Sequence, residues 1–181
     1  MKKLLSLSLV LVLMFTCAAA LAENKTGLGI VTSIDSSKPV GEKDGEKTNG
    51  TAQVDSTICA VTIDENGVIV SISFDVAQTR VPFTPEGEIA ADMTATIRSK
   101  MELKDDYNMR RASPIGKEIH EQVGAFEEYC LGKTVEEVLA MPLHDTDSHA
   151  DVPDGEDLKT SVTISVGEYL KALEKAAANA K

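Results

Sequence analysis

The chain of 181 residues has no tryptophan, few other aromatic residues and only three cysteines. Few aromatic side chains leave few rings that could stack on a planar ligand. Cys59 and Cys130 lie beyond the first 22 residues, and two cysteines are too few for a disulfide framework. The sequence leaves open whether they form one bridge or remain separate buried thiols. An apolar core must therefore hold the fold together.

Basic residues are also scarce. The chain has 18 Lys and Arg against 29 Asp and Glu, a net charge of −11. Loss of the first 22 residues would remove Lys2 and Lys3 and lower the charge by two, to −13. Nucleic acids and anionic membrane surfaces attract proteins through basic patches. The composition therefore argues against both as partners.

Long apolar runs are missing except at the start of the chain. Residues 4–15 form an apolar run broken only by Ser6 and Ser8, which follows two lysines and is shorter than the ~20 residues of a membrane-spanning helix. Ala20-Leu21-Ala22 has the small-x-small form of a cleavage site, so we expect an exported protein whose mature chain begins near Glu23. A lipid anchor at Cys17 is disfavoured because Phe15 is bulky where lipoprotein signals carry a smaller residue.

Residues 23–181 have the size of one domain, and a β-hairpin is their clearest predicted element. Two strand-like runs, residues 51–64 and 68–78, flank the pair Asn66-Gly67, which is typical of tight turns. Alternation in the second run predicts one buried face, and Pro82 is expected to end this strand. The residues predicted on the buried face are Val68, Val70, Ile72, Phe74 and Val76.

Helices are predicted mainly in the second half. Apolar residues recur every four positions over residues 89–101, which predicts a helix. Ser113 followed by proline predicts the start of a second helix, whose apolar stripe ends before Gly132. Thr134 opens a third through a capping box, and Ser165 is expected to cap the last.

The remaining segments complete the predicted order of elements. A first strand is predicted over residues 27–34, a polar loop over 35–50, and a last strand over 158–164, just before the final helix. Hairpins thus precede helices along the chain. This order favours an α+β fold, an antiparallel sheet with hairpins packed against C-terminal helices.

Hydroxyl residues gather just before the last predicted helix. A helix N-terminus offers unpaired N–H groups and a partial positive charge, which can hold a phosphate. The residues alone favour a simpler interpretation, with one helix cap and several strand residues, over a phosphate site. The segment reads Asp157-Leu158-Lys159-Thr160-Ser161-Val162-Thr163.

This segment resembles the flavin-contacting motif of the bacterial FMN-binding domain family, which includes exported flavoproteins and flavinylated subunits of ion-pumping redox complexes. The family motif is Asp-x-x-Thr/Ser-Gly-Ala-Thr/Ser. Asp157, Thr160 and Thr163 match it, whereas Ser161 and Val162 replace the Gly and Ala. The resemblance implies FMN contacts at Asp157, Thr160, Ser161 and Thr163. In some members the last hydroxyl is esterified to the flavin phosphate; the bulk of Val162 argues against such attachment at Thr163.

The resemblance implies an extracytoplasmic module for electron transfer or flavin carriage, with no catalytic residue of its own. Its partners would be a flavin transferase and membrane redox proteins. The flavin ring would need an apolar slot, for which Ile115, Ile119 and Phe126 are candidates, and Arg110 and Arg111 could neutralise the phosphate. The alternative is a secreted binding module without a cofactor.

Signs of a metal site or of nucleophilic catalysis are weak. Asp145, Asp147, Asp151 and Glu156 have the spacing of a calcium loop, but Ala150 occupies the position where that loop needs glycine. A Gly-x-Ser-x-Gly nucleophile elbow is absent from the sequence. We therefore predict neither a metal site nor a catalytic residue.

Overall fold

The computed structural model describes residues 23–181. The predicted signal peptide, its cleavage site at Ala22 and Cys17 therefore lie outside the described residues. Within the described range, a three-stranded antiparallel sheet has the order β1-β4-β5. Its strands are β1 (Lys25–Ser33), β4 (Gly50–Ile63) and β5 (Ile69–Phe83).

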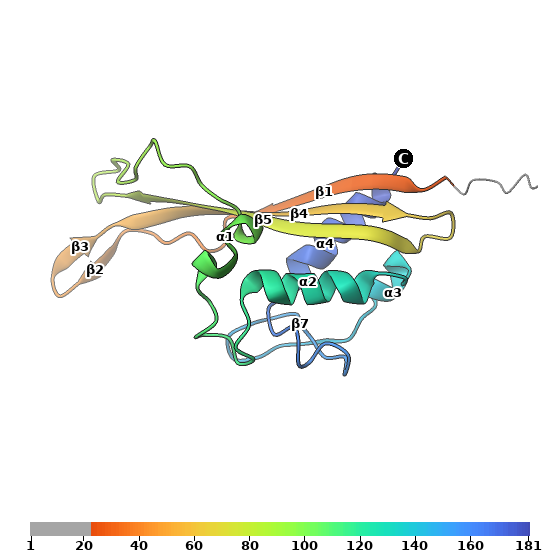
Figure 1. Ribbon diagram of the computed structural model, residues 1–181. Coiled ribbons are helices and arrows are strands. Elements are labelled where there is room, and N and C mark those ends of the chain that lie inside the picture. The colour runs from red at the N-terminus through yellow and green to blue at the C-terminus, as the bar shows by residue number, and fades with distance from the viewer. Residues whose placement is uncertain (1–22) are drawn as a thin grey trace, which may run out of the picture.

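The longer helices lie on one face of this sheet (Figure 1). The C-terminal helix contacts β1 and β4, and the helix that begins at Ile119 contacts β5. This arrangement confirms the predicted α+β fold. None of the helices in residues 23–181 has the length and apolar character needed to span a bilayer. The helices are α1 (Lys100–Leu103), α2 (Ile119–Cys130), α3 (Val135–Leu139) and α4 (Gly167–Ala178), with a 3-10 turn over Lys104–Tyr107.

Two glycines let α4 lie directly against β1. A Cβ atom on Gly27 would be 1.9 Å from the carbonyl oxygen of Ala176, and one on Gly29 would be 2.0 Å from that of Ala172. Both alanines are fully buried. The main-chain groups of Thr26 also bond those of Lys181 at the C-terminus. The sheet edge at β1 is thus covered by the end of the chain.

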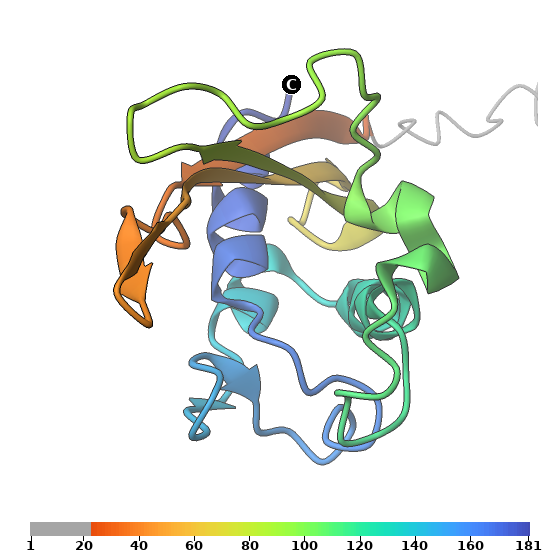
Figure 2. The same ribbon diagram turned by 90° about the vertical axis from the view of Figure 1, so that its left-hand side faces the viewer.

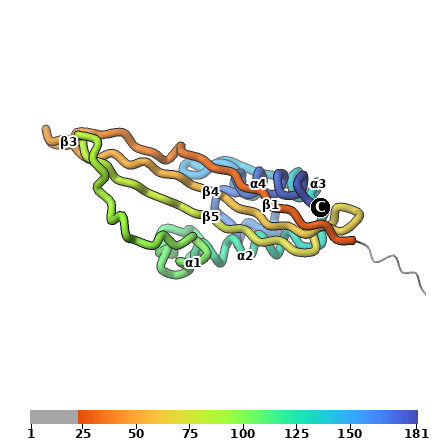
Figure 3. The backbone as a smooth tube through the Cα atoms, turned by 90° about the horizontal axis from the view of Figure 1, so that it is seen from above, coloured from red at the N-terminus to blue at the C-terminus, as the bar shows by residue number. Residues whose placement is uncertain are grey.

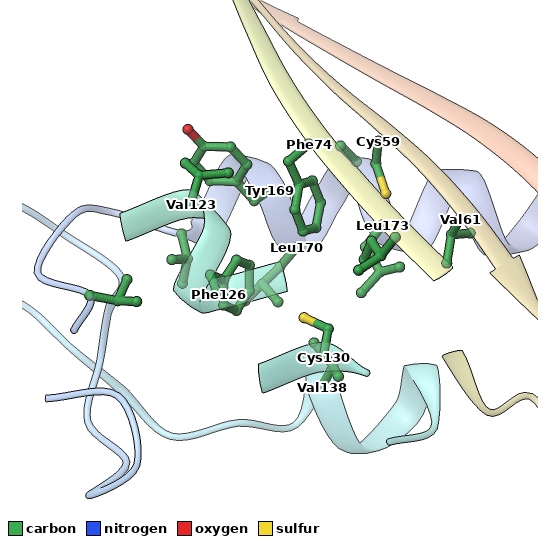
Figure 4. Close-up of a cluster of buried hydrophobic side chains, with 14 of the residues drawn as sticks. Cys59, Val61, Phe74, Val123, Phe126, Cys130, Val138, Tyr169, Leu170 and Leu173 are labelled. Atoms are coloured by element: carbon green, nitrogen blue, oxygen red, sulfur yellow. The ribbon is translucent and has the colours of Figure 1, made fainter. Parts of the chain in front are cut away.

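Aromatic rings form the centre of the core (Figure 4). Phe74 on β5 stacks on Phe126 of α2, with centroids 5.5 Å apart, and meets the edge of Tyr169 at 5.3 Å. Cys59 and Cys130 are both buried in this core as free thiols. Burial raises the pKa of each thiol to about 12. The described structure therefore contains two inert thiols rather than a bridge.

The predicted hairpin is present, but its buried face differs from the prediction. Ile69 is buried and Val70 is half exposed, because a register shift opposite Thr62 and Ile63 inserts one extra residue into β5. The strand also continues past Pro82, which pairs with Thr51 of β4. β5 is an edge strand, where a proline costs no sheet hydrogen bond.

The predicted helix over residues 89–101 is wrong. Within that range only Lys100 and Met101, the first two residues of α1, are helical, and a capping box at Ser99 starts this helix. Ile89, Met93 and Ile97 are all more than half exposed. Their spacing fits a helix, but no surface of the fold covers them, and a short helix without burial is not stable. Residues 84–98 instead form an irregular loop above the open face of the sheet (Figure 2).

Helix α2 begins later than the predicted start at Ser113. Gly116 has a φ of +64°, which breaks the helical path, and Glu118 is the N-cap. The end near Gly132 and the capping box at Thr134 are confirmed. The helix is thus shorter than predicted, and residues 108–117 form turns and irregular structure before it.

The last predicted strand, residues 158–164, is also wrong. Its first half is a series of turns closed by bonds from the Ser161 and Val162 amides to the Leu158 carbonyl. Val166, not Ser165, is the N-cap of α4. Short strand pairs occupy the predicted loop over residues 35–50 and the segment between α3 and α4. They are β2 (Gly41–Lys43) with β3 (Glu46–Thr48), and β6 (Leu143–His144) with β7 (Val152–Pro153).

Candidate functional site

Two cavities adjoin at Thr163. One measures about 480 Å³ and the other about 500 Å³, and both are lined by Pro114, His149 and Thr163. They lie where the loop before α2, the loop between β6 and β7, and the segment before α4 approach one another. A residue of the motif thus stands at the junction of two cavities, each in the range of small-molecule sites.

A buried glutamine on α2 holds Thr163 in place. Gln122 Oε1 accepts bonds from the Thr163 amide at 2.8 Å and from its hydroxyl at 3.2 Å. The Gln122 amide nitrogen donates to Ser113 Oγ at 3.2 Å and to the Lys117 carbonyl at 3.3 Å. Gln122 is fully buried. This one side chain therefore ties together the two loops that shape the cavities.

The other predicted contact residues lie elsewhere. Asp157 and Thr160 are exposed in the turns before Thr163. The Ser161 hydroxyl donates to the Leu158 carbonyl at 3.2 Å, and Val162 is fully buried. Asp157, Thr160 and Ser161 line neither cavity. Of the four motif positions, the structure places only Thr163 on the cavity walls.

The cavity of about 500 Å³ lies against the sheet and has a mixed wall. Val76, Ile119 and Tyr169 supply apolar surface, and Asp55 lies on the polar side. Asp55 Oδ2 accepts from the Gln53 amide at 2.7 Å, whereas Oδ1 is buried and has no hydrogen-bond partner. A buried acceptor without a partner is costly. This atom is therefore suited to receive a donor from a ligand.

The cavity of about 480 Å³ carries groups of both charge signs. His144, His149 and Lys159 line it together with Asp147 and Asp154. Lys159 Nζ lies 2.9 Å from Glu156 and 3.4 Å from Asp154, and both are exposed pairs that water screens. These carboxylates raise the Lys159 pKa. The lysine is thus always charged near neutral pH and only loosely held.

The predicted flavin slot and phosphate partners are dispersed. Ile119 lines a cavity, but Phe126 is buried in the aromatic core and Ile115 lines neither cavity. Arg110 already faces Glu118, Glu121 and Asp105 at 3.8, 3.1 and 3.4 Å. Arg111 is exposed. Among residues 23–181, no three His, Cys, Asp or Glu side chains are placed to share a metal ion.

Sequence reasoning missed Gln122 and Asp55. Gln122 is a polar residue within the apolar stripe of α2, and that mismatch was an available signal. Asp55 lies on β4 between two residues with ordinary strand character, and nothing in the sequence distinguished it. Comparison with known proteins finds no matching family model, no similar curated protein and no similar solved structure.

Proposed function

We propose that the protein is an exported module that binds FMN reversibly in the joined cavities at Thr163. It would carry the flavin or pass electrons rather than catalyse a reaction, with membrane redox proteins as partners. The observation that carries the proposal is the position of Thr163, the last residue of the flavin-type motif, on the walls of both cavities. Together they offer room for a two-part ligand.

The two cavities suit the two parts of FMN. In the cavity of about 480 Å³, Lys159 is the charged donor for a phosphate, although Asp147 and Asp154 line the same walls. The one against the sheet, with Val76 and Tyr169, suits a flat ring. The unpartnered Asp55 Oδ1 there could accept an N–H or a hydroxyl of the flavin. When bound, the flavin would supply the redox chemistry.

Covalent attachment at Thr163 does not fit this geometry. The Thr163 hydroxyl donates to Gln122 Oε1 at 3.2 Å. An ester oxygen has no proton, so esterification would leave two acceptors facing each other in a buried place, which is unfavourable. Reversible binding keeps the hydrogen bond. A flavin transferase is then not needed for this protein.

The same contact supports a second candidate, a secreted binding module without a cofactor. Gln122 satisfies both the amide and the hydroxyl of Thr163 within the protein itself. A threonine with complete hydrogen bonding needs no ligand. The two candidates differ in one observable property, the uptake of FMN.

The test is a fluorescence titration of FMN and of riboflavin into the full chain, expressed with its leader and purified after export. An absorbance spectrum and an intact mass come first. We expect saturable FMN binding and no flavin mass on the protein. Lys159→Gln should weaken FMN about tenfold, because it removes a charged hydrogen bond, and leave riboflavin unchanged.

Lys43→Gln is the control, since it removes the same charge from the exposed β2–β3 hairpin and lines neither cavity. It should leave both titrations unchanged. A protein that is colourless after export and does not quench FMN would contradict the flavin proposal and favour the cofactor-free module.

A further inference from the structure

A third cavity, of about 690 Å³, lies beside α1 and the outer half of β5. Figure 3 shows α1 next to this edge of the sheet. Its walls come from β5, from the irregular loop before α1 and from the 3-10 turn after it. It shares Lys100, Tyr107, Met109 and Ala112 with the cavity assigned to the flavin ring, but it reaches none of the motif residues.

Three basic side chains line this cavity, and only one acidic side chain opposes them. The acid, Asp106, pairs with Arg98 at 2.8 Å. Arg80 and Lys100 have no carboxylate within 4.0 Å among residues 23–181. Two positive charges are therefore left without an acidic partner in one cavity.

Other features of the protein make this excess unusual. The chain carries 29 acidic residues against 18 basic ones, so an exposed cation has many potential partners. Arg110, a short distance along the chain, faces three carboxylates. Against that background, the cavity concentrates positive charge where an anion can enter.

Arg80 and Lys100 are also held in position. Arg80 Nε donates to the Gln53 side-chain oxygen at 2.9 Å, and Gln53 is buried and in turn donates to Asp55. This leaves the terminal nitrogens of the Arg80 guanidinium free to bind. Lys100 Nζ lies 5.4 Å from the centre of the Tyr107 ring, a cation–π contact. Both cations are thus oriented by neutral groups, which do not neutralise their positive charge.

We propose that this cavity is a second binding site, for a small organic anion that carries a phosphate or two neighbouring carboxylates. Arg80 offers a planar set of N–H donors that matches either group, and Lys100 adds a second charge. Gln78 and Asn108 supply neutral polar contacts on the same walls. The proposal does not depend on the flavin, because Arg80, Gln78 and Asn108 line only this cavity, although Lys100 lines both.

The experiment is isothermal calorimetry on the full chain, processed and free of flavin, with pyrophosphate and citrate as probes at low ionic strength. We expect saturable binding of at least one probe, and the stronger of the two identifies a phosphate or a carboxylate ligand. Arg80→Gln and Lys100→Gln should each weaken that binding about tenfold, as expected for the loss of a charged contact. Raising the salt to about 0.15 M should also weaken the binding of the probe to the unaltered protein.

Lys43→Gln is the control, since it removes the same charge from the exposed β2–β3 hairpin, outside the cavity. Arg80 also donates a hydrogen bond to the buried Gln53, so Arg80→Gln could weaken binding through a folding defect. Lys100→Gln tests the same cavity without breaking that hydrogen bond. No heat with either probe, or equal losses in Lys43→Gln and the two cavity variants, would overturn the proposal. Arg80→Gln keeps the two proposals separate, because Arg80 lines only this cavity and the FMN titration is read from Lys159→Gln.

Discussion

The two ends of the sheet are stabilised in different ways. At the end where β1 begins, Gly27 and Gly29 bring α4 into contact with the strand, and the core is apolar and tightly packed. Toward the other end, Asp55 and Thr163 line a cavity, and the buried Gln122 accepts a hydrogen bond from Thr163. The first end is thus packed without space for a ligand, and the second contains the cavities in which we propose that FMN binds.

The largest expected effect is at the packed end. Gly29→Ala should destabilise the protein by about 3 kcal/mol or more, because its Cβ would overlap the Ala172 carbonyl and force the backbones apart. Gly124→Ala, on the exposed side of α2 with nothing within 4 Å, should instead stabilise by about 0.5–1 kcal/mol. Urea denaturation of both variants measures this. Equal effects would refute the close packing of α4 on β1.

At the cavity end, Gln122→Met should cost about 2 kcal/mol, since it leaves the Thr163 amide and the Lys117 carbonyl without partners. Thr163→Val should cost less, because the amide bond remains. Urea denaturation gives the two values, and FMN affinity should fall with Gln122→Met. If Thr163→Val proved the more damaging change, Gln122 would not be the residue that organises the loops.

The pH dependence of the free energy of unfolding is a second test of the packed end. Burial raises the pKa of Cys59 and Cys130 to about 12, from 9.0 for a free thiol. Above pH 9 the unfolded thiols lose protons that the folded thiols keep, so unfolding becomes more favourable. The stability they contribute is complete below pH 9 and is lost toward pH 12. Denaturation curves across this range should show the decline, and the double variant Cys59→Ala/Cys130→Ala should flatten it. A slope unchanged by the double variant would mean that the thiols are not buried.

The smallest effect concerns the edge of the packed end. Asn179 donates to the Leu28 carbonyl at 3.0 Å, so Asn179→Ala should cost about 0.5–1 kcal/mol. The freed edge of β1 should also exchange its amide hydrogens faster. Glu174→Ala on the same helix is the control. Unchanged exchange at β1 in the Asn179 variant would show that α4 does not protect this edge.

The sequence predicted the elements whose burial follows a local pattern, and it failed where long-range contacts decide the structure. Strand alternation and the Asn66-Gly67 turn follow from burial on one face, so the hairpin was predictable. The exposed Val70 was not, because a β-bulge changes the phase of the pattern. The helix predicted over residues 89–101 failed since its apolar residues meet no other surface. Gln122 stands out as a polar residue in an apolar stripe, but its bond to Thr163 spans 41 residues, and the partner of such a bond leaves no periodic signal.

The contacts expected from the flavin-type motif were likewise found at one position and not at the others. Thr163 lies on the cavity walls, but Asp157, Thr160 and Ser161 do not, because residues 158–162 form turns rather than a strand. A linear motif fixes spacing along the chain and says nothing about which way each turn faces. Contact residues on other elements, such as Asp55, could be found only once the sheet was in place.

The most direct measurement of the central claim is an NMR titration of the isotope-labelled protein with FMN, followed through its backbone amides. We predict that the signals of Asp55, Gln122 and Thr163 shift together and saturate, while those of Gly27 and Gly29 stay in place. No shift at Thr163 under saturating FMN, or shifts scattered over both ends of the sheet, would contradict the assignment of the flavin to this site.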